Sequence, residues 1–234
     1  MTNPQESADQ ILAEYKRRER EIPSDFYSLK HPANLFIQQG QTRGLLWALK
    51  TAALTPLNNR RIMEVGCGRG NWLSIFESFE AQRELLAGID LDEDRAAECR
   101  RRFVGADIRG GDATQLPWPD QHFDVVFQST VFTSILDAGM KQAVAREMLR
   151  VLKPQGAILW YDFHFNNPRN PHVRGVGRAE IKSLFPACSV TLRRMTLAPP
   201  IARRLVPISW IAAELLEKLQ LLNTHYFGVL RRSE

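Results

Sequence analysis

Short apolar runs followed by helical patterns recur along this chain. Residues 62–65 are apolar apart from one acid, and they run into a turn that contains three glycines. After the turn, apolar side chains recur at helical spacing: Trp72, Leu73, Ile75, Phe76 and Phe79. The order strand, glycine turn, helix is the first unit of a doubly wound α/β sheet.

The rest of the chain continues the alternation of strands and helices. Before the turn, residues 7–21 predict a charged helix, and a loop and a second helix then lead into the core. After it, the predicted elements are strands at 85–89 and 123–128 with a short strand between them, a fifth strand ending near 163, a helix at 179–185, a strand at 188–197, a helical stretch at 199–222 and a last strand at 225–231. These elements predict an α/β fold with a seven-stranded, mostly parallel sheet whose last strand is antiparallel.

Length and composition agree with one α/β unit with additions. The chain has 234 residues, of which 44% are hydrophobic, enough to bury a sizeable core. We divide it into a helical lead (1–44), a core (45–163) and a C-terminal elaboration (164–234). Its three cysteines lack metal-binding spacing and an even count, which favours a reducing cytoplasm over a disulfide framework. No apolar run approaches the length of a membrane-spanning helix.

The glycine turn indicates which ligand class this fold would bind. Its glycines are Gly66, Gly68 and Gly70, and the acid before them is Glu64. A dinucleotide site usually has Gly-x-Gly-x-x-Gly, but here the third glycine comes one residue early. No Lys-Ser or Lys-Thr pair follows, so the turn is not a phosphate loop either. Glycine suits a backbone with unusual dihedral angles and a ligand that approaches it closely.

Further features extend the pattern in the same order. Asp90 follows the second strand about twenty residues after the glycines, where an acid can accept hydrogen bonds from both ribose hydroxyls. Asp112 and Ala113 follow a short third strand, and a turn at 153–156 precedes the fifth strand. Over residues 45–163 the sequence resembles class I S-adenosylmethionine-dependent methyltransferases. Their turn more often has a second glycine where Gln155 stands, a difference that affects the turn and not the ligand.

The resemblance implies S-adenosylmethionine as the cofactor and an acid near the adenine amino group at Asp112. The residues that it places at the cofactor are Glu64, Gly66, Cys67, Gly68, Gly70, Asp90, Leu91, Asp112, Ala113 and Gln128. In relatives the lead segment often folds over the cofactor, so side chains of the second helix and its approach could face the methionine part: Tyr27, Asn34, Phe36, Gln39 and Arg43. Packing of an amphipathic helix on the sheet explains these five equally.

The acceptor chemistry is narrowed by what is missing. Enzymes of this class that methylate base amines carry Asp/Asn-Pro-Pro-aromatic after the fourth strand, where this chain has Gln-Ser-Thr-Val-Phe at 128–132. No cysteine follows a proline, which disfavours cytosine C5 chemistry. An oxygen nucleophile remains, and it needs a proton acceptor. Asp162 and His164 share one face at the end of the fifth strand, so His164 is the predicted base with Asp162 orienting it.

Three alternatives stay open at this strand end. His164 could be a hydrogen-bonded structural residue, and His172 in the next loop is a second candidate base. A magnesium ion could instead use Asp162, His164, Asn166 and Asn167, although the acid that metal-dependent relatives place after the fourth strand is replaced by Gln128 and Ser129.

Positive charge collects in the C-terminal part. From residue 164 onward there are eleven Lys and Arg against four Asp and Glu, within a net charge of +5 for the chain. Three arginines, Arg169, Arg174 and Arg178, fall in one stretch after the fifth strand, which suits an anionic or sugar-phosphate acceptor. The predicted substrate residues are Arg169, Arg174, His172 and Asn166. A solvated basic face explains these charges as well.

These observations leave four functional hypotheses. The first is O-methylation of a small molecule or glycan, because the stretch at 161–175 and the C-terminal residues 223–232 resemble a bacterial subset linked to polysaccharide assembly. The second is a quinone or lipid methyltransferase whose apolar segment 201–222 lies on a membrane; a lid or a homodimer face explains that segment equally. The third, disfavoured by the absence of an RNA-binding module, is an RNA methyltransferase. The fourth is a non-enzymatic cofactor sensor.

Overall fold

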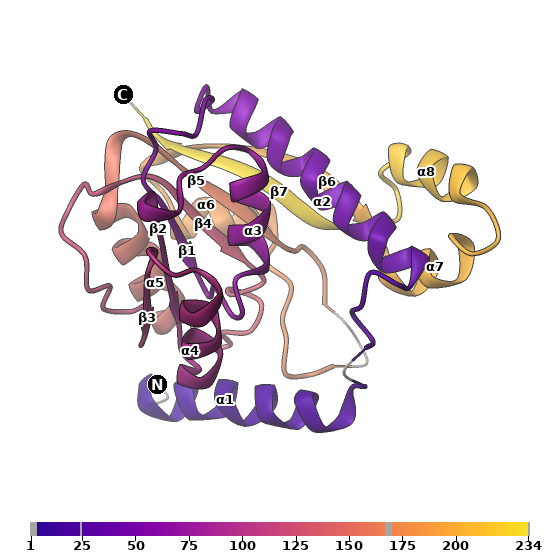
Figure 1. The fold of residues 1–234 in the computed structure, drawn as a ribbon, viewed down its shortest axis with the longest axis horizontal. Coiled ribbons are helices and arrows are strands. Elements are labelled where there is room, and N and C mark those ends of the chain that lie inside the picture. The colour runs from indigo at the N-terminus through magenta and orange to yellow at the C-terminus, as the bar shows by residue number, and fades with distance from the viewer. Residues whose placement is uncertain (1–3, 24, 167–169, 234) are drawn as a thin grey trace.

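A single sheet organises the molecule. The computed structural model describes residues 4–23, 25–166 and 170–233, which form seven strands with helices on both faces (Figure 1). The strands are β1 (Ile62–Val65), β2 (Leu86–Asp90), β3 (Asp107–Gly110), β4 (Phe123–Ser129), β5 (Leu152–Phe163), β6 (Cys188–Leu197) and β7 (Asn223–Arg232). Their order is β3-β2-β1-β4-β5-β7-β6, and only β7 runs antiparallel to its neighbours β5 and β6. The predicted fold class is confirmed.

Helices connect the strands and cover the sheet. They are α1 (Pro4–Glu21), α2 (Pro32–Thr51), α3 (Asn71–Ser78), the 3-10 turn η1 (Arg83–Leu85), α4 (Glu93–Arg102), α5 (Ala138–Val151), α6 (Arg178–Leu184), α7 (Pro199–Leu205) and α8 (Trp210–Lys218). Three of them begin with side-chain caps, in which Asp92, Asp137 and Ser209 accept hydrogen bonds from free N–H groups of the first turn. The expected division between residues 44 and 45 falls inside α2.

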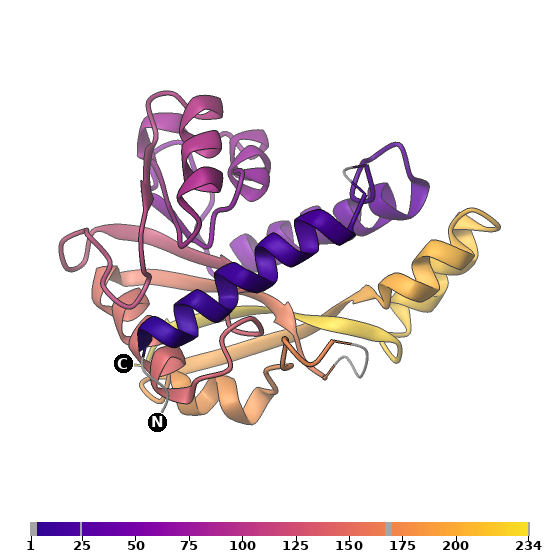
Figure 2. The same cartoon turned by 90° about the horizontal axis from the view of Figure 1, so that it is seen from below.

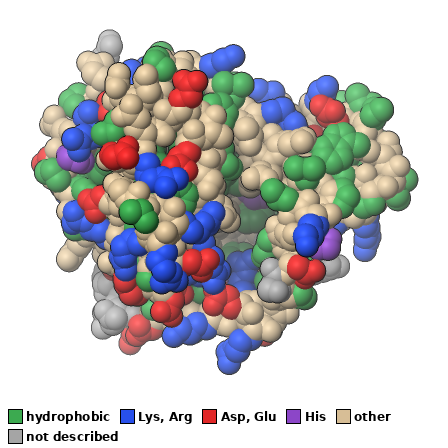
Figure 3. Space-filling model, in the orientation of Figure 1, with side chains coloured by type: hydrophobic (Ala, Val, Ile, Leu, Met, Phe, Trp, Pro, Cys, Tyr) green, Lys and Arg blue, Asp and Glu red, His purple; other side chains and the backbone are tan. Residues whose placement is uncertain are grey.

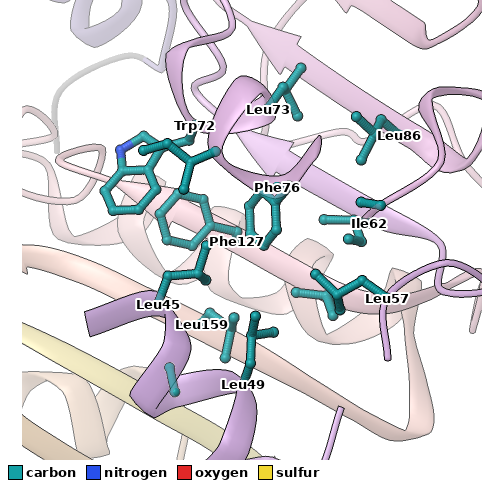
Figure 4. Close-up of a cluster of buried hydrophobic side chains, with 14 of the residues drawn as sticks. Leu45, Leu49, Leu57, Ile62, Trp72, Leu73, Phe76, Leu86, Phe127 and Leu159 are labelled. Carbon is teal, nitrogen blue, oxygen red and sulfur yellow. The ribbon is translucent and has the colours of Figure 1, made fainter. Parts of the chain in front are cut away.

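One face of the sheet packs against α2, α3 and α4. Figure 4 shows Leu45 and Leu49 of α2 meeting Phe127 and Leu159 of the central strands, with Phe76 of α3 beside them. All five side chains are buried. Burial of each such side chain contributes roughly 1.5 to 3 kcal/mol, so this layer fixes where the helices stand over the sheet.

The opposite face packs against α5 and α6. Val144 and Met148 of α5 and Ile181 of α6 are buried with Trp160 of β5 in a second apolar cluster. The two helices are also joined by an ion pair, in which Lys141 Nζ lies 2.7 Å from a Glu180 carboxylate oxygen. Since helices cover both faces of the sheet, a ligand would bind at the edge where the parallel strands end.

Two elements stand apart from these layers. Helix α1 crosses the edge of the sheet near the carboxyl ends of β1 and β2 (Figures 1 and 2). Helices α7 and α8 form a lobe beyond the start of α2, on the side away from β3 (Figure 1). A third apolar cluster, which includes Phe36 of α2 and Ala202 and Ala213 of the lobe, attaches them to the body. The predicted helical stretch at 199–222 is therefore two helices joined by a turn.

Candidate active site

A different neighbour explains why each of the three positions in the turn is a glycine. All have positive φ angles: 71° at Gly66, 50° at Gly68 and 82° at Gly70. A Cβ atom on Gly66 would lie 2.5 Å from Val131 Cγ2, and one on Gly70 would lie 2.4 Å from the Phe103 ring. The space beside Gly68 is open, and its nearest neighbour would be Asp90 Oδ2 at 4.0 Å. All three glycines therefore meet the expected need for unusual dihedral angles, and the open space that a ligand could use lies beside Gly68.

Asp90 ties the glycine turn to the second strand. Its Oδ2 accepts from the Gly68 N–H at 2.7 Å, and its Oδ1 accepts from the Asp92 N–H at 2.9 Å. Burial raises the pKa of Asp90, and the two backbone donors oppose that rise. Each carboxylate oxygen can accept a second hydrogen bond, so the side chain can still hold a pair of hydroxyl groups.

A small cavity opens beside Asp90 at the carboxyl edge of the sheet. Its lining includes Gly66, Asp90, Leu91, Asp112 and Ala113, all of them predicted cofactor residues. Asp112 uses one carboxylate oxygen to accept from the Thr114 N–H at 2.8 Å, which leaves the other for a donor such as an amino group. Apolar walls complete the cavity: Val65, Ile89, Val131, Ile135, Met140 and Val144. A cavity with apolar walls and hydrogen-bond acceptors at Asp90 and Asp112 suits a nucleoside.

Helix α1 closes this cavity with two side chains that the sequence analysis did not select. Ile11 and Tyr15 line it from above. Burial raises the pKa of the Tyr15 hydroxyl, the Asp90 charge adds to that rise, and a hydrogen bond with Ser134 opposes it. Ala8, Ile11 and Tyr15 recur at helical spacing, which indicates an apolar stripe on α1. The spacing does not show which part of the protein this stripe covers.

Polar contacts hold α1 against the body. Glu19 accepts from Arg95 at 2.9 Å and from Arg69 at 3.2 Å, and the Arg95 guanidinium lies 4.4 Å from the centre of the Tyr15 ring. Exposed ion pairs of this kind contribute about 0 to 1 kcal/mol each. The cavity below measures about 50 Å³, whereas ligand pockets commonly measure roughly 300 to 1,000 Å³. Helix α1 and Tyr15 therefore cover most of the pocket.

The other predicted cofactor residues lie behind the turn. Glu64 is buried, which raises its pKa well above the ordinary value, and nearby Cys99 and Asp90 add to that rise. Within the part of the chain that the structure describes, its Oε2 has no hydrogen-bond partner, so an acceptor is left over beside the turn. Cys67 packs under Gly88, and Gln128 accepts from the Val131 N–H at 3.1 Å. Both support the site's walls.

The five lead-segment candidates lie elsewhere. Phe36 is in the cluster under α7 and α8, and Asn34 donates to the carbonyl oxygens of Phe26 and Ser28. Arg43 pairs with Glu217 at 2.8 Å. Tyr27 and Gln39 are exposed. Packing accounts for Phe36 and Asn34, and the part of the lead segment that lines the pocket is α1.

Asp162 and His164 have separate partners. The Asp162 carboxylate accepts from the Thr133 hydroxyl at 2.6 Å and from the N–H groups of Thr133 and Phe163. His164 Nε2 lies 2.8 Å from the carbonyl oxygen of Asn223 on β7. The expected orientation of His164 by Asp162 is thus replaced by contacts with two different segments. Asp162 secures the loop after β4, and a catalytic role for His164 stays a prediction.

Burial dominates the electrostatics of Asp162. It raises the pKa of this carboxyl from 3.8 to about 7, and the Thr133 hydroxyl opposes the rise. The positive charge of Lys141 also lowers the pKa of Asp162.

A larger cavity adjoins the cofactor pocket. It measures about 620 Å³ and lies between α1 and the loops that follow β4 and β5. It shares Ile11, Tyr15 and Ser134 with the smaller cavity, so the two are continuous around α1. A separate hollow is visible in Figure 3 between the lobe of α3 and α4 and the lobe of α7 and α8.

Of the predicted substrate residues, His172 is the one that lines the larger cavity, where its Nε2 lies 3.9 Å from Glu14 Oε2. Arg174 has an exposed side chain and donates its N–H to Thr133. Asn166 accepts from the Gly175 N–H at 3.0 Å. Arg169 and Asn167 lie outside the described residues. Over the described ranges, no three His, Cys, Asp or Glu side chains gather as metal ligands would.

Comparisons with known proteins agree with this geometry. A family model for a methyltransferase domain matches residues 62–156. A fatty-acid O-methyltransferase from Mycolicibacterium smegmatis is 34% identical over 48% of this chain and 40% of its own length. A ubiquinone/menaquinone biosynthesis C-methyltransferase from Ectopseudomonas mendocina is 30% identical over 54% of this chain and 50% of its own length. The structure of an S-adenosylmethionine-dependent methyltransferase from Mesorhizobium loti matches with a TM-score of 0.59 at 16% identity, covering 80% of this chain and 98% of that one.

The chain spans half or less of the length of these two curated relatives. The structural match establishes the fold, and the sequence matches cover the strand, turn and acids that build the cofactor pocket. Residues 62–156 therefore carry a methyltransferase domain, and its cofactor is S-adenosylmethionine. The open space at Gly68, the free acceptor sites of Asp90 and Asp112 and the unpaired Glu64 oxygen all fit that cofactor.

Replacing Asp90 with Ala should weaken S-adenosylmethionine binding by about 2 to 3 kcal/mol, because charge-assisted hydrogen bonds to the ribose are lost. Calorimetric titration measures the change. Asp94→Ala, an exposed acid in the first turn of α4, is the matched control and should bind like the wild type. Unchanged affinity in a folded Asp90→Ala protein would remove Asp90 from the site.

Asp162 should make folding stability depend on pH. Its pKa is about 7 in the folded protein, against an ordinary value of 3.8, so the folded state keeps a proton that the unfolded chain releases. The stabilisation is complete below about pH 4 and is lost as the pH rises through 7. Asp162→Asn should flatten this fall when denaturant unfolding is followed from acid to neutral pH. Slopes equal to those of the wild type would show that Asp162 is ionised in the folded protein.

Proposed function

We propose that this protein transfers a methyl group from S-adenosylmethionine to an oxygen atom of an acceptor with an apolar part. The observation that carries the proposal is the cavity of about 620 Å³ that shares Ile11, Tyr15 and Ser134 with the cofactor pocket. Its volume lies within the usual range of roughly 300 to 1,000 Å³ for small-molecule sites. An acceptor bound there would lie next to the cofactor.

The walls of this cavity favour an apolar acceptor with one polar end. Ile11, Leu136 and Val173 supply apolar surface from three different segments. Polar groups collect on the α1 side and at His172: Gln10, Glu14, Arg17, Arg18 and His172. A sugar needs directed donors and acceptors around its whole ring, which fits this lining less well. The glycan acceptor expected from the sequence is therefore the less favoured form of the proposal.

His172 and Glu14 can remove a proton from the acceptor. The Arg17 side chain donates to Glu14 at 2.8 Å and lowers the pKa of Glu14, so this carboxylate is ionised near neutral pH. A carboxylate 3.9 Å from His172 Nε2 favours the imidazolium that forms when the ring accepts a proton. His172 is half-exposed and belongs to a loop, so closure of α1 would also exclude water from it.

S-adenosylmethionine supplies a methyl group on a positively charged sulfur, which an oxygen nucleophile displaces in line. The protein then has to hold the nucleophile, remove its proton and keep water out. One sequence relative is named as a fatty-acid O-methyltransferase and the other for ubiquinone/menaquinone biosynthesis, and both names point to largely apolar molecules, which supports an apolar acceptor here. A panel of fatty acids, hydroxylated lipids, quinols and sugars, read by S-adenosylhomocysteine release, tests the acceptor class. Turnover with sugars alone would contradict it.

His172→Gln should lower kcat by about 10² to 10⁴ with the best acceptor of that panel, while leaving cofactor affinity unchanged. Steady-state kinetics and cofactor titration measure the two effects.

His164→Gln is the matched variant, since His164 bonds to the Asn223 carbonyl oxygen and lines neither cavity. It should retain most of the activity. A large loss in His164→Gln together with full activity in His172→Gln would move the base to the end of β5.

A further inference from the structure

Helix α8 has two apolar faces, and the body of the protein uses only one of them. Ala213 is buried against the cluster that joins the lobe to α2, with Trp210 and Leu216 beside it. The opposite side carries Ile211 and Leu215, which are 72% and 59% exposed. At 100° per residue these two sets lie on opposite sides of the helix.

The exposed face continues beyond the ends of the helix. Ile208 before it is 82% exposed, and Leu219 and Leu221 after it are 63% and 77% exposed. Within the helix the exposed apolar pair is Ile211 and Leu215, and exposed apolar side chains flank it in the turns on either side, so we call Ile208, Ile211, Leu215, Leu219 and Leu221 together the α8 stripe. In Figure 3 apolar side chains gather on the lobe that α7 and α8 form. Isolated exposed apolar residues are ordinary, but a contiguous stripe marks an interaction surface.

The same lobe carries three cationic and two acidic side chains. Arg203 and Arg204 lie in the last turn of α7, where Arg203 stacks 4.1 Å from the centre of the Phe26 ring and Arg204 is exposed, and Lys218 ends α8. The two acids of α8 are engaged: Glu217 pairs with Arg43 at 2.8 Å and faces inward, and Glu214 lies 3.9 Å from Lys218. The lobe therefore combines an outward apolar stripe with an exposed arginine, as amphipathic helices on anionic lipid do.

We propose that the α8 stripe docks the protein on the surface of an anionic lipid bilayer. The helix would lie in the plane of the headgroups with Ile211 and Leu215 among the upper acyl chains, while the exposed Arg204 faces lipid phosphates. No helix within the described part of the chain has both the length and the apolar character needed to cross a bilayer, so the contact is peripheral. The stripe also lies outside residues 62–156, the segment that the family model matches. The proposal does not depend on the acceptor.

Sedimentation with vesicles tests this proposal without donor or acceptor. The full-length protein should bind vesicles of phosphatidylcholine mixed with phosphatidylglycerol, and bind more weakly to phosphatidylcholine alone. Ile211→Ser with Leu215→Ser should lower the partition coefficient by about tenfold or more, because two apolar side chains no longer enter the lipid. Arg204→Gln should weaken binding to the anionic vesicles only and reduce its salt sensitivity.

Val104→Ser is the matched control, since Val104 is 75% exposed and lies after α4, outside the lobe. Cofactor titration of each variant verifies its fold and tests the active site separately. Equal vesicle binding by the wild type and the Ile211→Ser/Leu215→Ser protein would overturn the proposal. So would a wild-type dimer in light scattering that this double variant converts to a monomer, because the stripe would then belong to a second copy of the chain.

Discussion

The hydrogen bond that the Asp90 carboxylate accepts from the Gly68 N–H is the contact on which the site depends. It joins the carboxyl ends of β1 and β2, and the Ile89 carbonyl oxygen reinforces it by accepting from the N–H groups of Gly66 and Cys67. A buried carboxylate is costly unless it is hydrogen-bonded, and here backbone donors supply that compensation. The same contact fixes the start of α3 and leaves open the space beside Gly68 where a cofactor can approach.

Local pattern predicted much of the fold. The strand at 188–197 has the predicted ends, and the last strand begins two residues earlier than predicted, because both have strong apolar runs bounded by turns. The apolar stripe of the 199–222 segment was also evident from its spacing, although the turn between α7 and α8 was not. Asp90 could be assigned because its distance from the glycines is characteristic of the fold.

Contacts between distant segments could not be predicted in the same way. Ile11 and Tyr15 close a pocket built some fifty to a hundred and thirty residues further along, and nothing in their own neighbourhood specifies that partner. Asp162 and His164 do share one face of β5. Strand alternation does not show, however, that Asp162 bonds to Thr133 and His164 to Asn223. Likewise, positive φ angles could be expected at all three glycines, whereas the clashes with Val131 and Phe103 required coordinates.

Hydrogen–deuterium exchange with and without S-adenosylmethionine can show whether the cofactor binds where Asp90 meets the glycine turn. Exchange should be slower at residues 66–70, 90–92 and 112–114 when the cofactor is present, together with a changed exchange rate in α1, which lines the pocket. Protection confined to other segments, with these residues and α1 unaffected, would contradict it.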